Sequence, residues 1–270
     1  MGLSDISKQL DARKQTSTKE QPYAMGRQTV RKARTDLTNK DFEASIKLKT
    51  MPAVKWLEVQ FPPVFIEEIN QYIDDVVIPK NKDYSDKLVG QLKGEKSAQL
   101  DFPLKGHETG EQFKKVLENL GKSFVQKPYN RMSSVECFEC WTVHSYEGDY
   151  NPMHDHGVRT QSGLSCILYL KVPDSIKNKP QIEVPNLNQA SGEIDGWTQF
   201  VWGANTMKDI YQLREQTQHV VRPVEGKLLM FPCWLNHMVW PFRGEGERRT
   251  LSANFNIHDS PEVTKQFAER

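Results

Sequence analysis

The sequence contains no uninterrupted apolar run of 18 residues, the length at which a segment becomes a candidate for a membrane-spanning helix. Its first residues lack the apolar core of a secretion signal. The start MGLSDI resembles a myristoylation site, but Ile6 occupies the position where serine or threonine is required. We therefore expect a soluble protein of the cytoplasm, with no membrane partner.

Cysteine is scarce, with four residues in a chain of 270. Cys137 and Cys140 form a CxxC pair, which alone is a weak indicator of a zinc or redox site. The surrounding VECFECWTVHSY has the pattern of a strand, in which residues three apart point to opposite faces. We therefore expect buried, reduced thiols, which fit a reducing compartment.

Large apolar side chains are few in residues 1–50, which carry eleven Lys and Arg against six Asp and Glu. Such a segment buries too little surface to offset its ordering entropy. We predict a basic, flexible N-terminal extension, with short helices at most, near residues 5–14 or 40–48. An acidic partner or nucleic acid is a weaker alternative to a solvated extension for this excess of positive charge.

Residues 51–132 change in character. AVKWLEVQFPP alternates like a strand, and Phe65 to Val76 has the spacing of an amphipathic helix that Pro79 ends. A second amphipathic helix is predicted over residues 110–127. We interpret residues 51–132 as a helical support region.

Short strand patterns separated by glycine and proline turns dominate residues 133–260, with no helical pattern between them. This arrangement indicates an antiparallel barrel or sandwich. The predicted fold is therefore mainly β with flanking helices (α+β). Residues 133–260 would form the core and residues 261–270 a C-terminal tail.

Histidines form the first chemical pattern. In a strand His154 and His156 would point to one face and Asp155 away from it. His237 follows a distant apolar run, FPCWLNH. Imidazole binds Fe, Zn, Cu and Ni, and three ligands on one face leave coordination positions open for a substrate. We predict that His154, His156 and His237 hold one metal, although a surface HDH loop with a core histidine is the simpler alternative.

An arginine pair follows at the start of the last predicted strand. Alternation puts Arg248 on one face with Thr250, Ser252 and Asn254, and Arg249 on the other. A guanidinium beside a hydroxyl can bind a carboxylate through paired hydrogen bonds. We favour Arg248 over Arg249 for this role.

Four motifs, taken in order, resemble the Fe(II)/2-oxoglutarate-dependent dioxygenases, most closely a subgroup of marine bacteria and T4-like phages. The resemblance covers about residues 135–258. The residues that carry it are Gly148, Asn151, His154 and His156, then Ser165 to Leu170, Phe231 to His237, and Arg248 to Asn254. The chain departs from better-studied relatives by having His156 where they have a metal-binding acid, unless Asp155 serves instead.

The resemblance implies a double-stranded β-helix, that is, a jelly-roll or cupin-like barrel with helices packed on one face. It implies Fe(II) held by the three histidines and 2-oxoglutarate held by Arg248, with Thr250 or Ser252 and with Tyr146 or Tyr169 as further hydrogen-bond donors. Molecular oxygen and a small-molecule or peptide substrate would be the other reactants. A phage-encoded protein would work in the host cytoplasm.

Two alternatives belong to other classes. A cupin-like metalloenzyme would use the same histidines without 2-oxoglutarate, and it would release no succinate. A non-enzymatic binding or structural protein associated with phage would bind no iron and would retain a stable partner.

Overall fold

A computed structural model describes residues 30–36, 41–47, 54–129, 131–157, 162–178, 194–203 and 217–268. The chain divides into two compact units, Met1–Val54 and Lys55–Arg270. In the first unit β1 (Val30–Asp36) pairs antiparallel with β2 (Asp41–Lys47). Residues 41–47 are thus a strand where the sequence allowed a helix. The rest of the expected extension, including the helix allowed near residues 5–14, lies outside the described residues.

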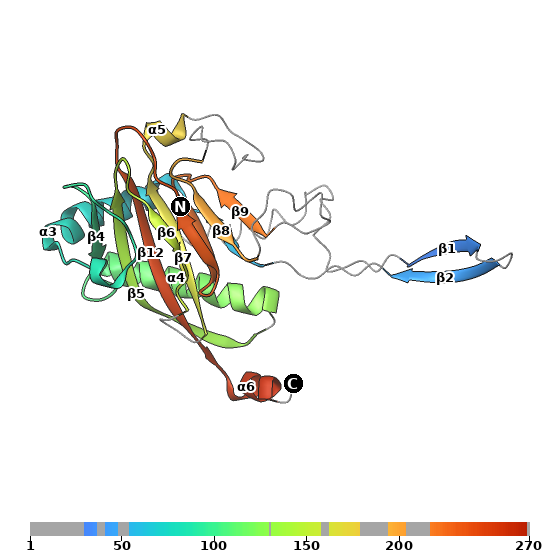
Figure 1. Ribbon diagram of the computed structural model, residues 1–270. Coiled ribbons are helices and arrows are strands. Elements are labelled where there is room, and N and C mark those ends of the chain that lie inside the picture. Colours follow the sequence, from blue (N-terminus) through green and yellow to red (C-terminus); the bar gives the residue numbers. More distant parts are fainter. Residues whose placement is uncertain are drawn as a thin grey trace. The chain divides into compact units, whose positions relative to one another are not determined.

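The second unit contains two antiparallel sheets (Figure 1). The larger has the order β3-β10-β7-β12-β5-β4 and the smaller the order β6-β11-β8-β9. The strands of the larger sheet are β3 (Leu57–Gln60), β4 (Ala98–Asp101), β5 (Ser133–Ser145), β7 (Gly163–Lys171), β10 (Lys227–Pro232) and β12 (Arg248–Asp259). Those of the smaller are β6 (Asn151–His154), β8 (Thr198–Val201), β9 (Gln218–Val221) and β11 (Asn236–Val239).

This is the predicted jelly-roll arrangement, mainly β with flanking helices. The described strands form two separate sheets rather than a closed barrel. A cavity lies between the sheets, since residues of β6 and β11 line it from one side and residues of β4, β5, β7 and β12 from the other.

Helices cover the opposite face of the larger sheet. The helical segments are α2 (Pro63–Tyr72), η2 (Ile73–Val77), α3 (Ile78–Lys80), η3 (Ser85–Lys87), α4 (Glu108–Tyr129), α5 (Asp174–Lys177) and α6 (Pro261–Ala268). Figure 1 shows α4 lying across the larger sheet. Ile69 of α2 and Leu117 of α4 are buried in one apolar cluster with Leu251, Ala253 and Phe255 of β12. The helices therefore seal the main core and leave the other face of the sheet to the cavity.

The first predicted helix continues slightly beyond Pro79. The π-helical turn η2 precedes this proline, and the helix ends where Asn81 adopts a left-handed conformation with φ of 45°. Asn and Gly are the residues that accept this conformation most readily.

Cys137 and Cys140 lie on the same face of β5, so the predicted opposite orientation is wrong. The pairing with β12 shifts at Phe138, because Phe255 faces Cys137 while Asn254 faces Glu139. This β-bulge adds one residue to β5 and turns both cysteines into the apolar core. The prediction of buried, free thiols is confirmed. Burial raises the pKa of both thiols, so they are poor metal ligands.

Residues 51–132 supply more than helices, since β3 and β4 form the two edges of the larger sheet. The boundary predicted at residue 132 stays a prediction. Among the described residues, no helix has both the length and the apolar composition to cross a bilayer.

Candidate metal centre and its cavity

The three predicted histidines converge at one end of the cavity. His154 ends β6 and lies directly across from His237 of β11. His156 comes after the strand, in a turn, and its backbone N–H donates to the carbonyl of Cys233 at 2.8 Å. The expectation that a continuing strand aligns His154 with His156 is therefore wrong in detail. The turn returns His156 to the same point.

Ligand atoms of His154, His156 and His237 all lie within 4.8 Å of one another. The ring centroids are 4.3 Å apart for His154 and His237, and 5.2 Å apart for each of the other two pairs. His156 and His237 are buried. Nitrogens bound to one metal at about 2.0–2.1 Å must lie within roughly 4 Å of each other, so the group needs only small ring movements to coordinate.

Hydrogen bonds fix which ring nitrogen is available. Nδ1 of His154 lies 2.7 Å from the carbonyl oxygen of Pro152, and Nδ1 of His237 lies 3.0 Å from that of Leu235. A carbonyl only accepts, so each Nδ1 carries the proton and each Nε2 keeps its lone pair. Burial lowers the pKa of both imidazoles, and the two neighbouring rings lower that of His237 further. Neutral imidazoles with oriented lone pairs fit a divalent transition metal.

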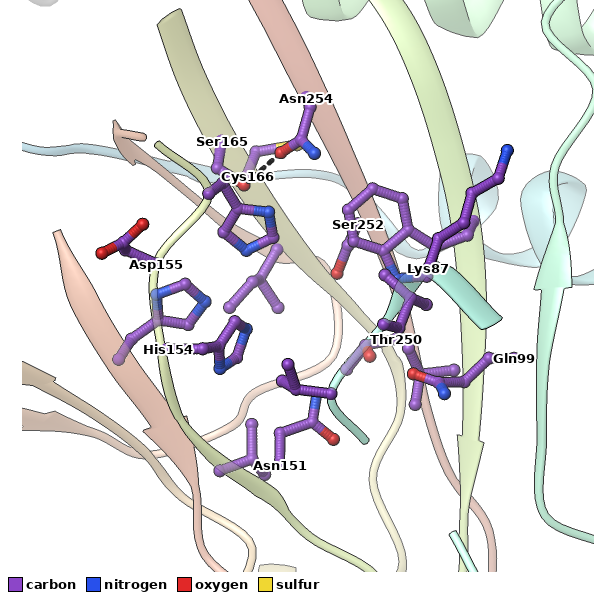
Figure 2. Close-up of a pocket in the computed structure, with 18 of the residues that line it drawn as sticks. Lys87, Gln99, Asn151, His154, Asp155, Ser165, Cys166, Thr250, Ser252 and Asn254 are labelled. Atoms are coloured by element: carbon purple, nitrogen blue, oxygen red, sulfur yellow. Dashed lines mark hydrogen bonds between the residues drawn. The ribbon is translucent and has the colours of Figure 1, made fainter. Parts of the chain in front are cut away.

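Asp155 is exposed, and its carboxylate accepts the N–H of Gly157 at 2.8 Å. Figure 2 shows this carboxylate directed away from the imidazole rings. The local geometry thus favours three histidines over a set that includes Asp155.

Arg248 and Arg249 are both buried but have different surroundings. Arg249 is fully paired: it lies 2.8 Å from Glu247 and 2.7 Å from Asp74, and it donates to Asn70 at 3.1 Å. Arg248 lines the cavity and donates through Nε to the carbonyl of Gly196 at 3.0 Å.

One guanidinium nitrogen of Arg248, Nη2, is buried without a hydrogen-bond partner. Among the described residues, no carboxylate pairs with this cation. A buried charge left in this state is costly, so Arg248 is suited to bind an anion that enters the cavity.

The other predicted residues divide into two groups. Thr250 and Ser252 line the cavity beside Arg248, as strand alternation indicated. Tyr169 lies outside the residues that line the cavity. Its hydroxyl donates to Thr198 at 2.8 Å, and its ring centroid lies 5.5 Å from the guanidinium carbon of Arg248. Tyr146 also lies outside the wall, where burial and then the charge of Glu247 raise its pKa.

Sequence reasoning missed the part of the wall that comes from outside the β core. Lys87, Leu88 and Val89, together with Gln99 of β4, line the cavity opposite the histidines. The LVGQLKG stretch at residues 88–94 resembles the Fe(II)/2-oxoglutarate-dependent dioxygenases only weakly, and Lys87 and Gln99 carry no pattern typical of a site. Their position follows from the pairing of β4 with the edge of β5.

Residues 139–254 match the model of a family described as "Putative 2OG-Fe(II) oxygenase". This segment contains all three histidines and Arg248. No curated protein matches the chain.

Several solved structures share the fold. SnoK, a non-heme alpha ketoglutarate dependent carbocyclase from nogalamycin biosynthesis, is 10% identical over 80% of this chain and 86% of its own, with a TM-score of 0.51. A Pseudomonas putida prolyl-4-hydroxylase is 14% identical over 77% and 94%, with a TM-score of 0.48. HygX from Streptomyces hygroscopicus, with nickel and 2-oxoglutarate bound, is 12% identical over 75% and 83%, with a TM-score of 0.47.

At such low sequence identity these three structures show a similarity of fold only. The comparison rests on SnoK, whose TM-score is 0.51. The family match covers residues 139–254, and the three histidines within this segment form a group that could hold a metal ion. Residues 139–254 are therefore similar to the 2OG-Fe(II) oxygenases in sequence pattern, and the second unit is similar to SnoK in fold.

Proposed function

We propose that this chain hydroxylates a C–H bond of a substrate still to be identified, consuming 2-oxoglutarate and O2 and releasing succinate and CO2. The observation that carries the proposal is the meeting of two features in one cavity. Three imidazoles lie at one end, and a guanidinium nitrogen of Arg248 that is buried without a hydrogen-bond partner belongs to a residue of the same cavity wall.

His154, His156 and His237 would hold Fe(II), and Arg248 with Thr250 or Ser252 would bind the distal carboxylate of 2-oxoglutarate. When bound, iron supplies the oxidising centre at which O2 is reduced as 2-oxoglutarate loses CO2 and one oxygen atom enters the substrate. The residues of the chain bind and orient the reactants and keep water out of the site. Trp141 stacks on His156 with ring centroids 5.9 Å apart and supports that ring from the cavity wall.

The first test uses the weak visible absorption band of an iron–keto acid chelate. Anaerobic Fe(II) and 2-oxoglutarate should give this band with the wild-type protein. His237→Ala should abolish it, since two imidazoles remain and the chelate loses its third protein ligand. A wild-type protein that stays folded and gives no band would contradict the proposal, and a metal-dependent product without succinate would favour the cupin-like alternative.

The second test separates the two arginines. Arg248→Met should raise the 2-oxoglutarate concentration that gives half of the maximal band by about 10- to 100-fold, because a charge-assisted hydrogen-bonded pair is lost. Iron should still bind. Arg249→Met should instead lower the melting temperature with little change in that concentration, because Arg249 pairs with Glu247 and Asp74. The reverse result would assign the carboxylate to Arg249.

Three finer assignments are also proposals. The motif order supports membership of the subgroup of marine bacteria and T4-like phages. The charge of residues 1–50 supports contact with an acidic partner or nucleic acid, which salt-dependent binding would test. The buried, free cysteines support a cytoplasmic location.

A further inference from the structure

Gln99 is a buried polar residue of the cavity that the proposed chemistry does not use. It lies on β4, where Ala98 and Leu100 on either side pack into the apolar core. Gln99 points to the other face and lines the cavity, and it is only 2% exposed. Figure 2 shows its side chain entering from the side of Thr250, across from His154.

The carboxamide oxygen of Gln99, Oε1, is buried without a hydrogen-bond partner. An unmet buried acceptor destabilises a fold by about 1–3 kcal/mol, so such groups are rare unless a ligand completes them. The residues beside it are apolar: Val143 is its cross-strand partner, and Leu88 and Trp141 lie in the same wall.

The lack of a side chain at Gly90 leaves space for this carboxamide. A Cβ at residue 90 would lie 2.7 Å from Oε1 and 3.0 Å from both Cδ and Nε2. The glycine therefore leaves room for the amide plane to lie flat against the chain. Any side chain at this position would displace the amide.

In the orientation that the structure gives this amide, the co-substrate does not match Oε1 as a partner. The 2-oxoglutarate dianion has two carboxylates and a ketone, all of which are acceptors, whereas Oε1 requires a donor. A carboxamide also presents an N–H donor beside its oxygen. A hydroxyl and an amide each offer a donor and an acceptor, and the amide, which has separate N–H and C=O groups, is the better match for the two ends of a carboxamide next to an apolar wall.

We propose that Gln99 is a specificity residue that binds an amide group of the oxidised substrate, so that the substrate class is amide-bearing, such as a peptide or an acylated amine. This inference rests on the proposed function. Gln99 would orient the substrate from the wall opposite the imidazoles and take no part in metal or 2-oxoglutarate binding.

The test compares Gln99→Met with Gln199→Met. Gln199 is equally buried but fully paired, since it donates to Gln218 at 2.7 Å and accepts from Trp240 at 2.9 Å. Removing the unpaired amide should raise the melting temperature by about 2–4 °C, and removing the paired one should lower it. A fall for Gln99→Met like that of the control would show a structural role and overturn the proposal.

Two further measurements on the same variants locate the ligand. The 2-oxoglutarate concentration that gives half of the maximal chelate band should be unchanged in Gln99→Met. A rise of fivefold or more would show that Gln99 binds the co-substrate and would overturn the proposal. Succinate release is then measured with N-acetyl amino acid methylamides and with the matched O-acetyl 2-hydroxy acid methyl esters, which contain no amide. The wild-type enzyme should respond to amides over esters, and Gln99→Met should lose this preference.

Gly90→Ala keeps the glutamine but displaces its amide, so it should also lose the preference for amides. No response to any amide, or an equal response to esters, would overturn the assignment of substrate class. A missing chelate band in the wild-type protein would refute the iron function instead. The two failures are distinguishable because the melting comparison needs neither metal nor co-substrate.

Discussion

Two adjacent arginines show how single residues on one strand acquire different roles. Alternation turns Arg249 toward the helices, where Glu247 and Asp74 neutralise it, and turns Arg248 into the cavity, where a guanidinium nitrogen stays unpaired. The sequence places both at the start of the same strand. Their surroundings make one of them structural and leave the other available for an anion.

Glu247 is the centre of the buried charge network that surrounds Arg249. Burial alone would raise the pKa of Glu247, but hydrogen bonds from His144 at 2.7 Å and from Arg249 at 2.8 Å outweigh it and lower the pKa to about 2. A carboxyl group with a lowered pKa stabilises the fold above its ordinary value of 4.5, and that contribution is lost as the pH falls from about 4.5 to about 2.

Glu247→Gln should therefore lower the free energy of unfolding at pH 7 by up to about 3 kcal/mol and flatten its pH dependence between pH 4.5 and 2. Urea unfolding at several pH values measures both effects. The exposed Glu245 provides the control, because Glu245→Gln should leave the slope as in the wild type. An unchanged slope in Glu247→Gln would show that the network does not hold this carboxylate.

At the scale of elements, the close approach of α4 to β5 determines how the helical layer sits on the larger sheet. Gly121 lies in α4 at the contact with β5. A Cβ there would lie 2.7 Å from Cγ1 of Val135 and 3.6 Å from Cδ1 of Leu164. Glycine weakens a helix interior by up to about 1 kcal/mol relative to alanine, so its presence here follows from packing.

Gly121→Ala should destabilise the protein by about 1–2 kcal/mol, because overpacking against Val135 exceeds the gain in helix propensity. Chemical denaturation measures the change. Val135→Ala creates space at the same contact, so the double variant should be more stable than the sum of the two single effects indicates. Strict additivity would mean that the two side chains do not meet.

At the scale of the whole molecule, the site is contained in one of the two units. The histidines, Arg248, Gln99 and the main apolar core all belong to Lys55–Arg270. The strands that line the cavity come from distant parts of this unit, so the cavity exists only when the two sheets are formed.

Removal of residues 1–54 should leave a folded protein with the same iron and 2-oxoglutarate chelate band. The reason is that each ligand and each core strand is retained. The melting temperature and the half-saturating 2-oxoglutarate concentration of the shortened and full chains provide the comparison. Loss of the band in a shortened protein that still melts cooperatively would mean that the first unit contributes to the site.

The sequence alone predicts which chemical groups the strands of the core carry. His154, His156, His237 and Arg248 are predictable because their residue types, spacing and order limit what they can bind, and alternation is a local property of a strand. The same local rule failed at Phe138, where an added residue turned Cys137 and Cys140 to one face. A bulge depends on the partner strand, and the sequence of β5 alone does not contain it.

Which residues complete the cavity follows from the assembled sheets and not from any local pattern. Gln99 carries no motif and reaches the cavity because β4 pairs with β5 at the sheet edge, while Gly90 lies in the LVGQLKG stretch at residues 88–94, which resembles the dioxygenases only weakly. That pairing joins segments some 40 residues apart in the chain, so its energy comes from contacts that no local pattern encodes. The histidine group could be predicted from the sequence, whereas the wall of the cavity around Gln99 depends on the assembled sheets.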